Sequence, residues 1–184
     1  MNIILASQSP RRKEILESLG VNFEVKVSHT DEYFDPALPL GQALENVAYQ
    51  KAKAIFDKHA DACVIAADTI VAFEGKLYGK PKDLAEARFF LESFSGKIQQ
   101  VMTGICILYQ DKKWCHVDTT DVVFRPLSEQ DITNYLEHFD VLDKAGAYGI
   151  QDSDFVSEIR GSYTNVVGLS KESMEKMLKE IGVL

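Results

Sequence analysis

The chain has 184 residues, of which 46% are hydrophobic and 26% are charged, and its formal net charge at pH 7 is −8. This length is enough to bury a core, so folding requires neither disulfides nor a structural metal. The acidic balance argues against binding of the nucleic-acid backbone, and no run of about 20 apolar residues marks a membrane span.

The spacing of apolar residues, with cap and turn residues, predicts strands and helices along the first half of the chain. The expected elements are a strand at 2–6, a helix at 10–19, a strand at 23–27, a helix at 41–58, a strand at 62–73 with a hairpin turn at 74–76, and a helix at 83–94. Ser9 is a suitable N-cap for the first helix and Pro10 a suitable first helical residue, while Gly20 marks its end. An acidic, proline-bearing segment at 28–39 separates the second strand from the second helix.

The second half of the chain predicts long antiparallel strands. They lie at 98–109 and 114–124 and are joined by a tight turn at 111–113. A capping box at Ser128 then begins a helix that runs to about 139. The remaining expected elements are a loop at 141–154, a strand at 155–159 and a helix at 170–181. Hairpins require antiparallel pairs, so we expect an α/β protein with a mixed sheet. With no repeat and no linker, residues 1–184 are predicted to form a single domain.

The three cysteines predict no metal site. Cys63, Cys106 and Cys115 form no CxxC pair and have no histidine cluster beside them. Cys63 and Cys106 lie inside apolar runs, where a cysteine usually behaves as a small buried hydrophobe. An odd number of cysteines fits a reducing compartment, and no signal-peptide pattern is seen at the N-terminus. We therefore expect a cytoplasmic protein.

Two arginines, Arg11 and Arg12, fall in the first turn of the predicted helix that begins at Pro10. A helix N-terminus already carries positive charge and free N–H groups, so acidic residues are the stabilising choice there. Two cations at this end make sense when a phosphate lies among them. The alternative is a solvated basic helix start, at a cost of a few tenths of a kcal/mol.

Lys51 and Asp68 each interrupt apolar surroundings. Lys51 lies in the middle of the apolar face of the second helix, between Leu44 and Ile55, so it must either snorkel to solvent or meet an anion. Asp68, followed by Thr69, lies inside the long apolar strand, where an ionised carboxylate is costly unless it is paired, hydrogen-bonded or bound to metal. A structural bulge is the alternative at Asp68, and we favour a functional site.

Glu32, Lys80 and Gln151 are polar residues in predicted loops, and each by itself is typical of a solvated turn. Taken together, the cations and acids match a site for a polyphosphate with Mg²⁺ or Mn²⁺, in which carboxylates hold the metal and position a water. The cations are Arg11, Arg12, Lys51 and Lys80, and the acids are Glu32 and Asp68. The amide of Gln151 can both donate to and accept from a uracil or thymine edge.

Five short blocks of sequence occur in order along nearly the whole chain. They are residues 5–12 (LASQSPRR); Ala48 with Lys51 and Ala52; residues 67–71 (ADTIV) with 79–81 (GKP); Ser95 and Gly96 with residues 101–104 (VMTG); and residues 143–151 (DKAGAYGIQ) with 161–163 (GSY) and 165–169 (NVVGL). This ordered set resembles the Maf family of nucleotide pyrophosphatases. The resemblance implies an elongated, two-lobed, mixed-sheet α/β fold akin to inosine triphosphate pyrophosphatases.

The resemblance also implies a reaction, which is hydrolysis of a nucleoside triphosphate at the α-phosphorus with release of pyrophosphate and a need for a divalent cation. Asp68 takes the place of the family's proposed proton acceptor. Arg11, Thr69 and Gln151 take the places linked to base choice, and the branch with Ser-Pro-Arg-Arg prefers dTTP and UTP. The chain departs from the family pattern at Asp152, where a glycine is usual, and at Ser170, where a proline is usual.

From the residues and the resemblance together, we expect Asp68 and Glu32 to bind the metal ion, and Arg12, Lys51 and Lys80 to neutralise the phosphates. The expected partner is a nucleoside triphosphate, without nucleic acid or membrane, and a homodimer is left open. Two alternatives are a nucleotide-binding regulator of septum formation without turnover, and a house-cleaning enzyme for modified nucleotides.

Overall fold

The computed structural model describes residues 1–29 and 31–184. Within them, a seven-stranded sheet has the order β2-β1-β3-β5-β6-β7, and β4 pairs with β3. The strands are β1 (Ile3–Leu5), β2 (Glu24–Val25), β3 (Cys63–Phe73), β4 (Lys76–Tyr78), β5 (Ile98–Tyr109), β6 (Lys112–Phe124) and β7 (Val156–Arg160). Because β1 pairs in parallel with β2 and β3 while β3–β4 and β6–β7 are antiparallel, the predicted mixed α/β fold is confirmed.

The chain forms two compact units. Unit 1 comprises Met1–Thr69, Thr103–Asp118 and Gly168–Leu184, and unit 2 comprises Ile70–Met102 and Thr119–Val167. The strands β3, β5 and β6 therefore contribute residues to both units.

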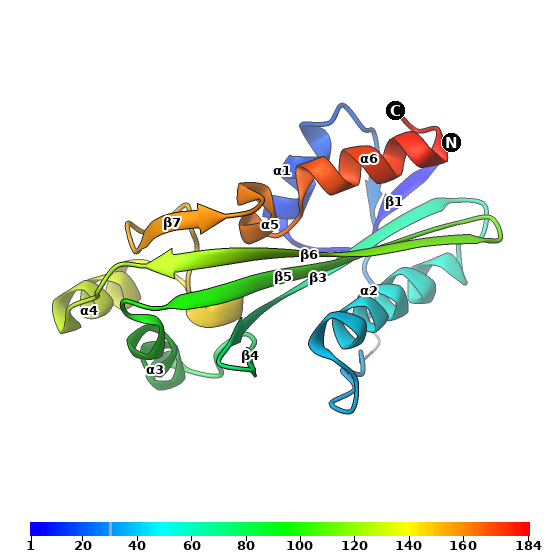
Figure 1. The fold of residues 1–184 in the computed structure, drawn as a ribbon. Coiled ribbons are helices and arrows are strands. Elements are labelled where there is room, and N and C mark those ends of the chain that lie inside the picture. Colours follow the sequence, from blue (N-terminus) through cyan, green and yellow to red (C-terminus); the bar gives the residue numbers. More distant parts are fainter. Residues whose placement is uncertain (30) are drawn as a thin grey trace. The chain divides into compact units, whose positions relative to one another are not determined.

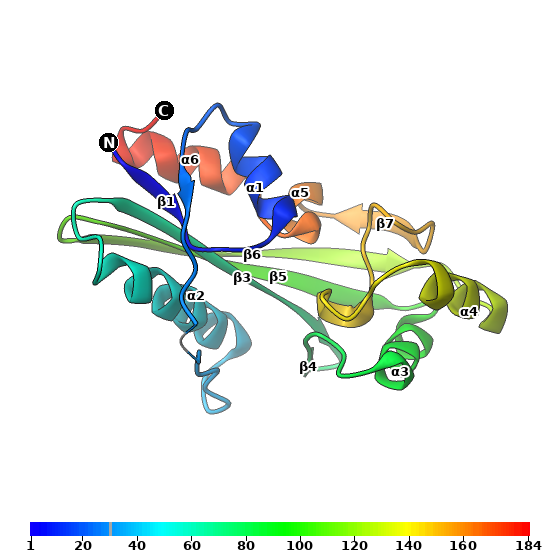
Figure 2. The same ribbon diagram turned by 180° about the vertical axis from the view of Figure 1, so that it is seen from behind.

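Unit 1 is a three-layered arrangement of helices on a sheet. Its helices are α1 (Pro10–Glu17), α2 (Leu40–Phe56) and α6 (Lys171–Ile181). The helices α1 and α6 contact each other and lie on one face of the strands of this unit, whereas α2 lies on the opposite face (Figures 1 and 2). Alternate residues of the strands, such as Ile4 and Val64, form a buried apolar core with Ala48 and Ala52 of α2.

Unit 2 has an aromatic core. It contains α3 (Leu84–Phe94), α4 (Glu129–His138), the short 3-10 helix η1 (Ala145–Ala147) and α5 (Tyr163–Val167). The rings of Phe94, Phe124 and Tyr148 pack edge to face with centroids 4.8–6.4 Å apart. Gly146 closes this core at a φ of 71°, and a Cβ at that position would lie 2.8 Å from the Val71 side chain.

The structure confirms the local signals at two helix starts and corrects one turn. The side chain of Ser9 caps α1, and Ser128 forms the expected capping box with Asp131 at the start of α4. The turn expected at 111–113 lies instead at residues 110–111, so β6 begins at Lys112 and not at 114. Gln110 adopts a φ of 54°, which allows a two-residue turn. The shorter turn lets β6 begin two residues earlier than expected.

Candidate active site

Two clusters of polar side chains in unit 1 meet at consecutive residues of β3. Successive side chains of a strand point to opposite faces of its sheet. Val64 and Ala66 pack toward α2, so Asp68, two residues further, faces the same side. Thr69 faces the side on which α1 lies, and it contacts Arg12 of that helix. One cluster is thus the Lys51–Asp68 pair and the other surrounds Arg12.

In the Lys51–Asp68 pair, the ammonium of Lys51 donates to Oδ1 of Asp68 at 2.5 Å. The side chains are only 22% and 25% exposed. The strand thus carries its interior carboxylate without a penalty for an unpaired charge, and the lysine on the apolar helix face meets an anion. Lys51 therefore supplies the positive partner expected for Asp68, and Asp68 supplies the anion expected for Lys51.

Arg12 is held by hydrogen bonds from all three nitrogens of its guanidinium. Nε donates to the carbonyl of Gly168 at 2.9 Å, Nη1 to Oγ of Ser7 at 3.2 Å, and Nη2 to Oγ1 of Thr69 at 2.9 Å. The Thr69 hydroxyl also lies 2.9 Å from that of Thr103. We call these residues the Arg12 cluster. It ties the start of α1 to β3, β5 and the segment before α6.

Burial lowers the pKa of Arg12, Asp68 opposes this shift, and the neighbouring charge of Arg11 adds to it. An arginine remains protonated under these conditions. A guanidinium carries five N–H groups, so one N–H on each terminal nitrogen is left over by the three hydrogen bonds. The cluster can therefore both hold the arginine in place and present it to an anion.

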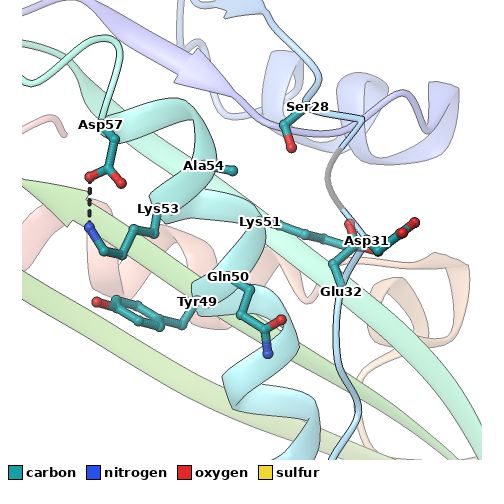
Figure 3. A pocket seen from close by; sticks show the side chains of 9 residues that line it. All are labelled: Ser28, Asp31, Glu32, Tyr49, Gln50, Lys51, Lys53, Ala54 and Asp57. Carbon is teal, nitrogen blue, oxygen red and sulfur yellow. Dashed lines mark hydrogen bonds and ion pairs between the residues drawn. The ribbon is translucent and has the colours of Figure 1, made fainter.

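A pocket of about 330 Å³ lies beside Lys51. Its lining includes Asp31 and Glu32 from the acidic loop and Tyr49, Gln50 and Lys51 from α2. Figure 3 shows Lys51 pointing from the helix toward the loop that carries the two carboxylates. The side chain of Gln50 fastens this loop to α2, because it both donates to and accepts from the backbone of Tyr33.

The structure divides the predicted site residues between the units. Arg11, Arg12, Glu32, Lys51, Asp68 and Thr69 belong to unit 1, and Lys80 and Gln151 belong to unit 2. Lys80 and Gln151 are both exposed on loops. Within unit 2 these loops are linked, because the backbone N–H of Gly146 donates to the carbonyl of Gly79 at 3.1 Å.

The described residues contain no assembled metal site. In the described residues, no three His, Cys, Asp or Glu side chains are grouped so that they could hold a metal ion. The carboxylate of Asp68 is occupied by Lys51, while Asp31 and Glu32 face the pocket next to that lysine. Carboxylate oxygens are the donors that Mg²⁺ and Mn²⁺ prefer, so the chemistry of this set fits such an ion.

Sequence reasoning missed Ser7 and Thr103 as individual members of the Arg12 cluster. Both are buried, at 8% and 0% exposure. Thr103 had a usable signal, because it interrupts an apolar strand just as Asp68 does. Its partner could not be read from the sequence, since 34 residues separate it from Thr69.

Comparisons with known proteins agree with this fold. At 15% identity and a TM-score of 0.57, the structure of the Staphylococcus aureus Ham1 protein covers 98% of this chain and 100% of its own, which shows a shared fold.

No helix among the described residues has both the length and the apolar character to cross a membrane.

Sequence relatives are much closer. A dTTP/UTP pyrophosphatase of Bacillus pumilus is 42% identical over 183 residues, covering 98% of this chain and 97% of the relative. One from Halalkalibacterium halodurans is 44% identical over 182 residues, covering 98% and 96%. The family described as Maf-like protein matches residues 2–181. The chain therefore belongs to the Maf family.

Proposed function

We propose that this chain hydrolyses nucleoside triphosphates, preferentially dTTP and UTP, to the monophosphate and pyrophosphate. The observation that carries the proposal is the Lys51–Asp68 pair beside an acidic pocket, in a chain 42–44% identical to relatives named dTTP/UTP pyrophosphatase. A carboxylate can accept a proton from water, and an ammonium next to it can neutralise phosphate charge.

In the proposed mechanism, Asp68 orients the attacking water and accepts its proton. Lys51 holds the Asp68 carboxylate by its hydrogen bond. The free N–H groups of Arg12, together with Lys51 and Lys80, neutralise charge that develops on the phosphates in the transition state. We further propose that Arg11, Thr69 and Gln151 determine base choice.

We propose Glu32 and Asp68 as the residues that hold a divalent cation, Mg²⁺ or Mn²⁺. When bound, the cation would neutralise phosphate oxygens as a Lewis acid. Glu32→Gln is expected to raise the Mn²⁺ concentration for half-maximal activity at least ~10-fold, because an amide is a weaker ligand than a carboxylate. Asp31→Asn in the same pocket is the matched control, and we expect little change. A shift for Asp31→Asn alone would transfer the metal role to Asp31.

The activity is tested by pyrophosphate release from ribo-, deoxy- and modified nucleoside triphosphates with Mg²⁺, with Mn²⁺ and with a chelator. We expect metal-dependent turnover that is fastest with dTTP and UTP. Turnover of modified nucleotides alone would keep the reaction and overturn the base assignment. Nucleotide binding without pyrophosphate release would contradict the enzymatic function and favour a regulator.

A further inference from the structure

A pair of cysteines that the proposed reaction does not use lies in unit 1. Cys106 on β5 and Cys115 on β6 are free thiols whose sulfur atoms are 2.6 Å apart. Both belong to the core under α2, with Cys106 fully buried and Cys115 packed against that core. Their separation is shorter than two unbonded sulfur atoms usually keep, and a disulfide requires about 2.05 Å.

The hairpin geometry explains why these two residues meet. The turn at residues 110–111 places Tyr109 opposite Lys112, and three steps back along each strand bring Cys106 opposite Cys115. Opposed pairs of an antiparallel ladder alternate between hydrogen-bonded and non-hydrogen-bonded. The pair that flanks a two-residue turn is hydrogen-bonded, so the cysteines form a non-hydrogen-bonded pair. The Cα atoms of such a pair are about 4.5 Å apart, within the range of about 4.4–6.8 Å that a disulfide allows.

The two thiols differ in pKa and in exposure. The hydrogen bond between the two sulfur atoms lowers the pKa of Cys115, and the nearby charge of Lys113 acts in the same direction. The same hydrogen bond, with burial, raises the pKa of Cys106 well above its usual value. Cys115 is also the more exposed of the two. A thiolate is the nucleophile in thiol–disulfide exchange, so Cys115 is the attacking residue and Cys106 the resolving one.

We propose that Cys106 and Cys115 are a modification site, which closes to a reversible disulfide by exchange with a low-molecular-weight disulfide of the glutathione type. The Cys115 thiolate attacks one sulfur of that disulfide, forming a mixed disulfide and releasing one thiolate. The sulfur of Cys106, after losing its proton, attacks the Cys115 sulfur and releases the second thiolate. Two protein thiols are oxidised and one small disulfide is reduced to two thiols.

The full-length reduced protein is incubated with oxidised glutathione and then analysed by intact mass, thiol alkylation after unfolding, and peptide mapping. We expect loss of two hydrogen atoms, no retained glutathione, a Cys106–Cys115 cross-link, and a single alkylated thiol on Cys63. Cys63 is an internal control, because it is fully buried and burial raises its pKa to about 11. Dithiothreitol should restore all three thiols.

Two variants separate the roles. Cys106→Ser is expected to accumulate a glutathione adduct on Cys115, because the resolving thiol is gone. Cys115→Ser is expected not to react while folded, since the remaining thiols are buried. The proposal is overturned when the wild-type protein retains three free thiols in oxidised glutathione, when it retains the adduct, or when the cross-link involves Cys63. The wild-type result stands even if a variant fails to fold.

Discussion

Asp68→Asn is expected to lower the rate of pyrophosphate release at least ~100-fold, the usual scale for a positioned acid or base. An amide cannot accept the proton of the attacking water, and it offers Lys51 a neutral partner in place of an anion. The change is nearly isosteric, so the protein should remain folded. Initial rates with dTTP at saturating Mn²⁺ measure the effect, and circular dichroism checks the fold.

Asp111→Asn is the matched control for this variant, since it makes the same substitution at an exposed turn residue. It should leave the rate within experimental error of the wild-type value. Full activity in Asp68→Asn would remove Asp68 from the mechanism. A loss of activity accompanied by unfolding would assign to the Lys51–Asp68 pair a structural role only.

Arg12→Met is expected to have the largest effect on stability, lowering the free energy of unfolding by about 3 kcal/mol. Methionine fills a similar volume but removes the hydrogen bonds that the guanidinium donates to Ser7, Thr69 and Gly168. A hydrogen bond to a charged group contributes about 1.5–3 kcal/mol, and the three acceptors recover part of the loss through their remaining partners and water. Urea denaturation followed by circular dichroism measures the change.

The matched control is Arg11→Met, which removes the same charge from the adjacent residue. Both arginines are partly exposed, but it is Arg12 that is tied to Ser7, Thr69 and Gly168, so Arg11→Met should change the free energy of unfolding by about 0.5 kcal/mol or less. Equal effects of the two substitutions would show that the hydrogen bonds of Arg12 do not hold unit 1 together. A stable Arg12→Met protein that has lost turnover would instead assign Arg12 to the phosphates alone.

Local signals in the sequence were sufficient for most of the secondary structure. Ser9 and Ser128 predict helix starts because a cap involves only neighbouring residues, and both are seen in the structure. Lys51 and Asp68 stand out because each places a charge where the pattern demands an apolar residue. The mix of strands and helices, with two hairpins that require antiparallel pairs, likewise indicated a mixed sheet.

The hairpin of β5 and β6 shows how a small error in a boundary changes which residues are opposed. The turn expected at 111–113 would have placed Cys106 opposite Asp118, whereas the turn at residues 110–111 places it opposite Cys115. The register of a hairpin depends on the length of its turn, and a glutamine at a φ of 54° is a conformation that composition does not signal.

The sequence by itself therefore determined the order of most elements (α5 and η1 were not predicted), the class of the fold, its family and the charged positions that need a partner. Only the tertiary structure decided which partners they have. Lys51 meets Asp68 and Arg12 meets Thr69 because consecutive side chains of β3 face helices on opposite sides of the sheet. The physical reason is that the local sequence shows where a charged side chain falls among apolar residues and so needs a partner. Which atoms become that partner depends on how segments far apart in the sequence pack together.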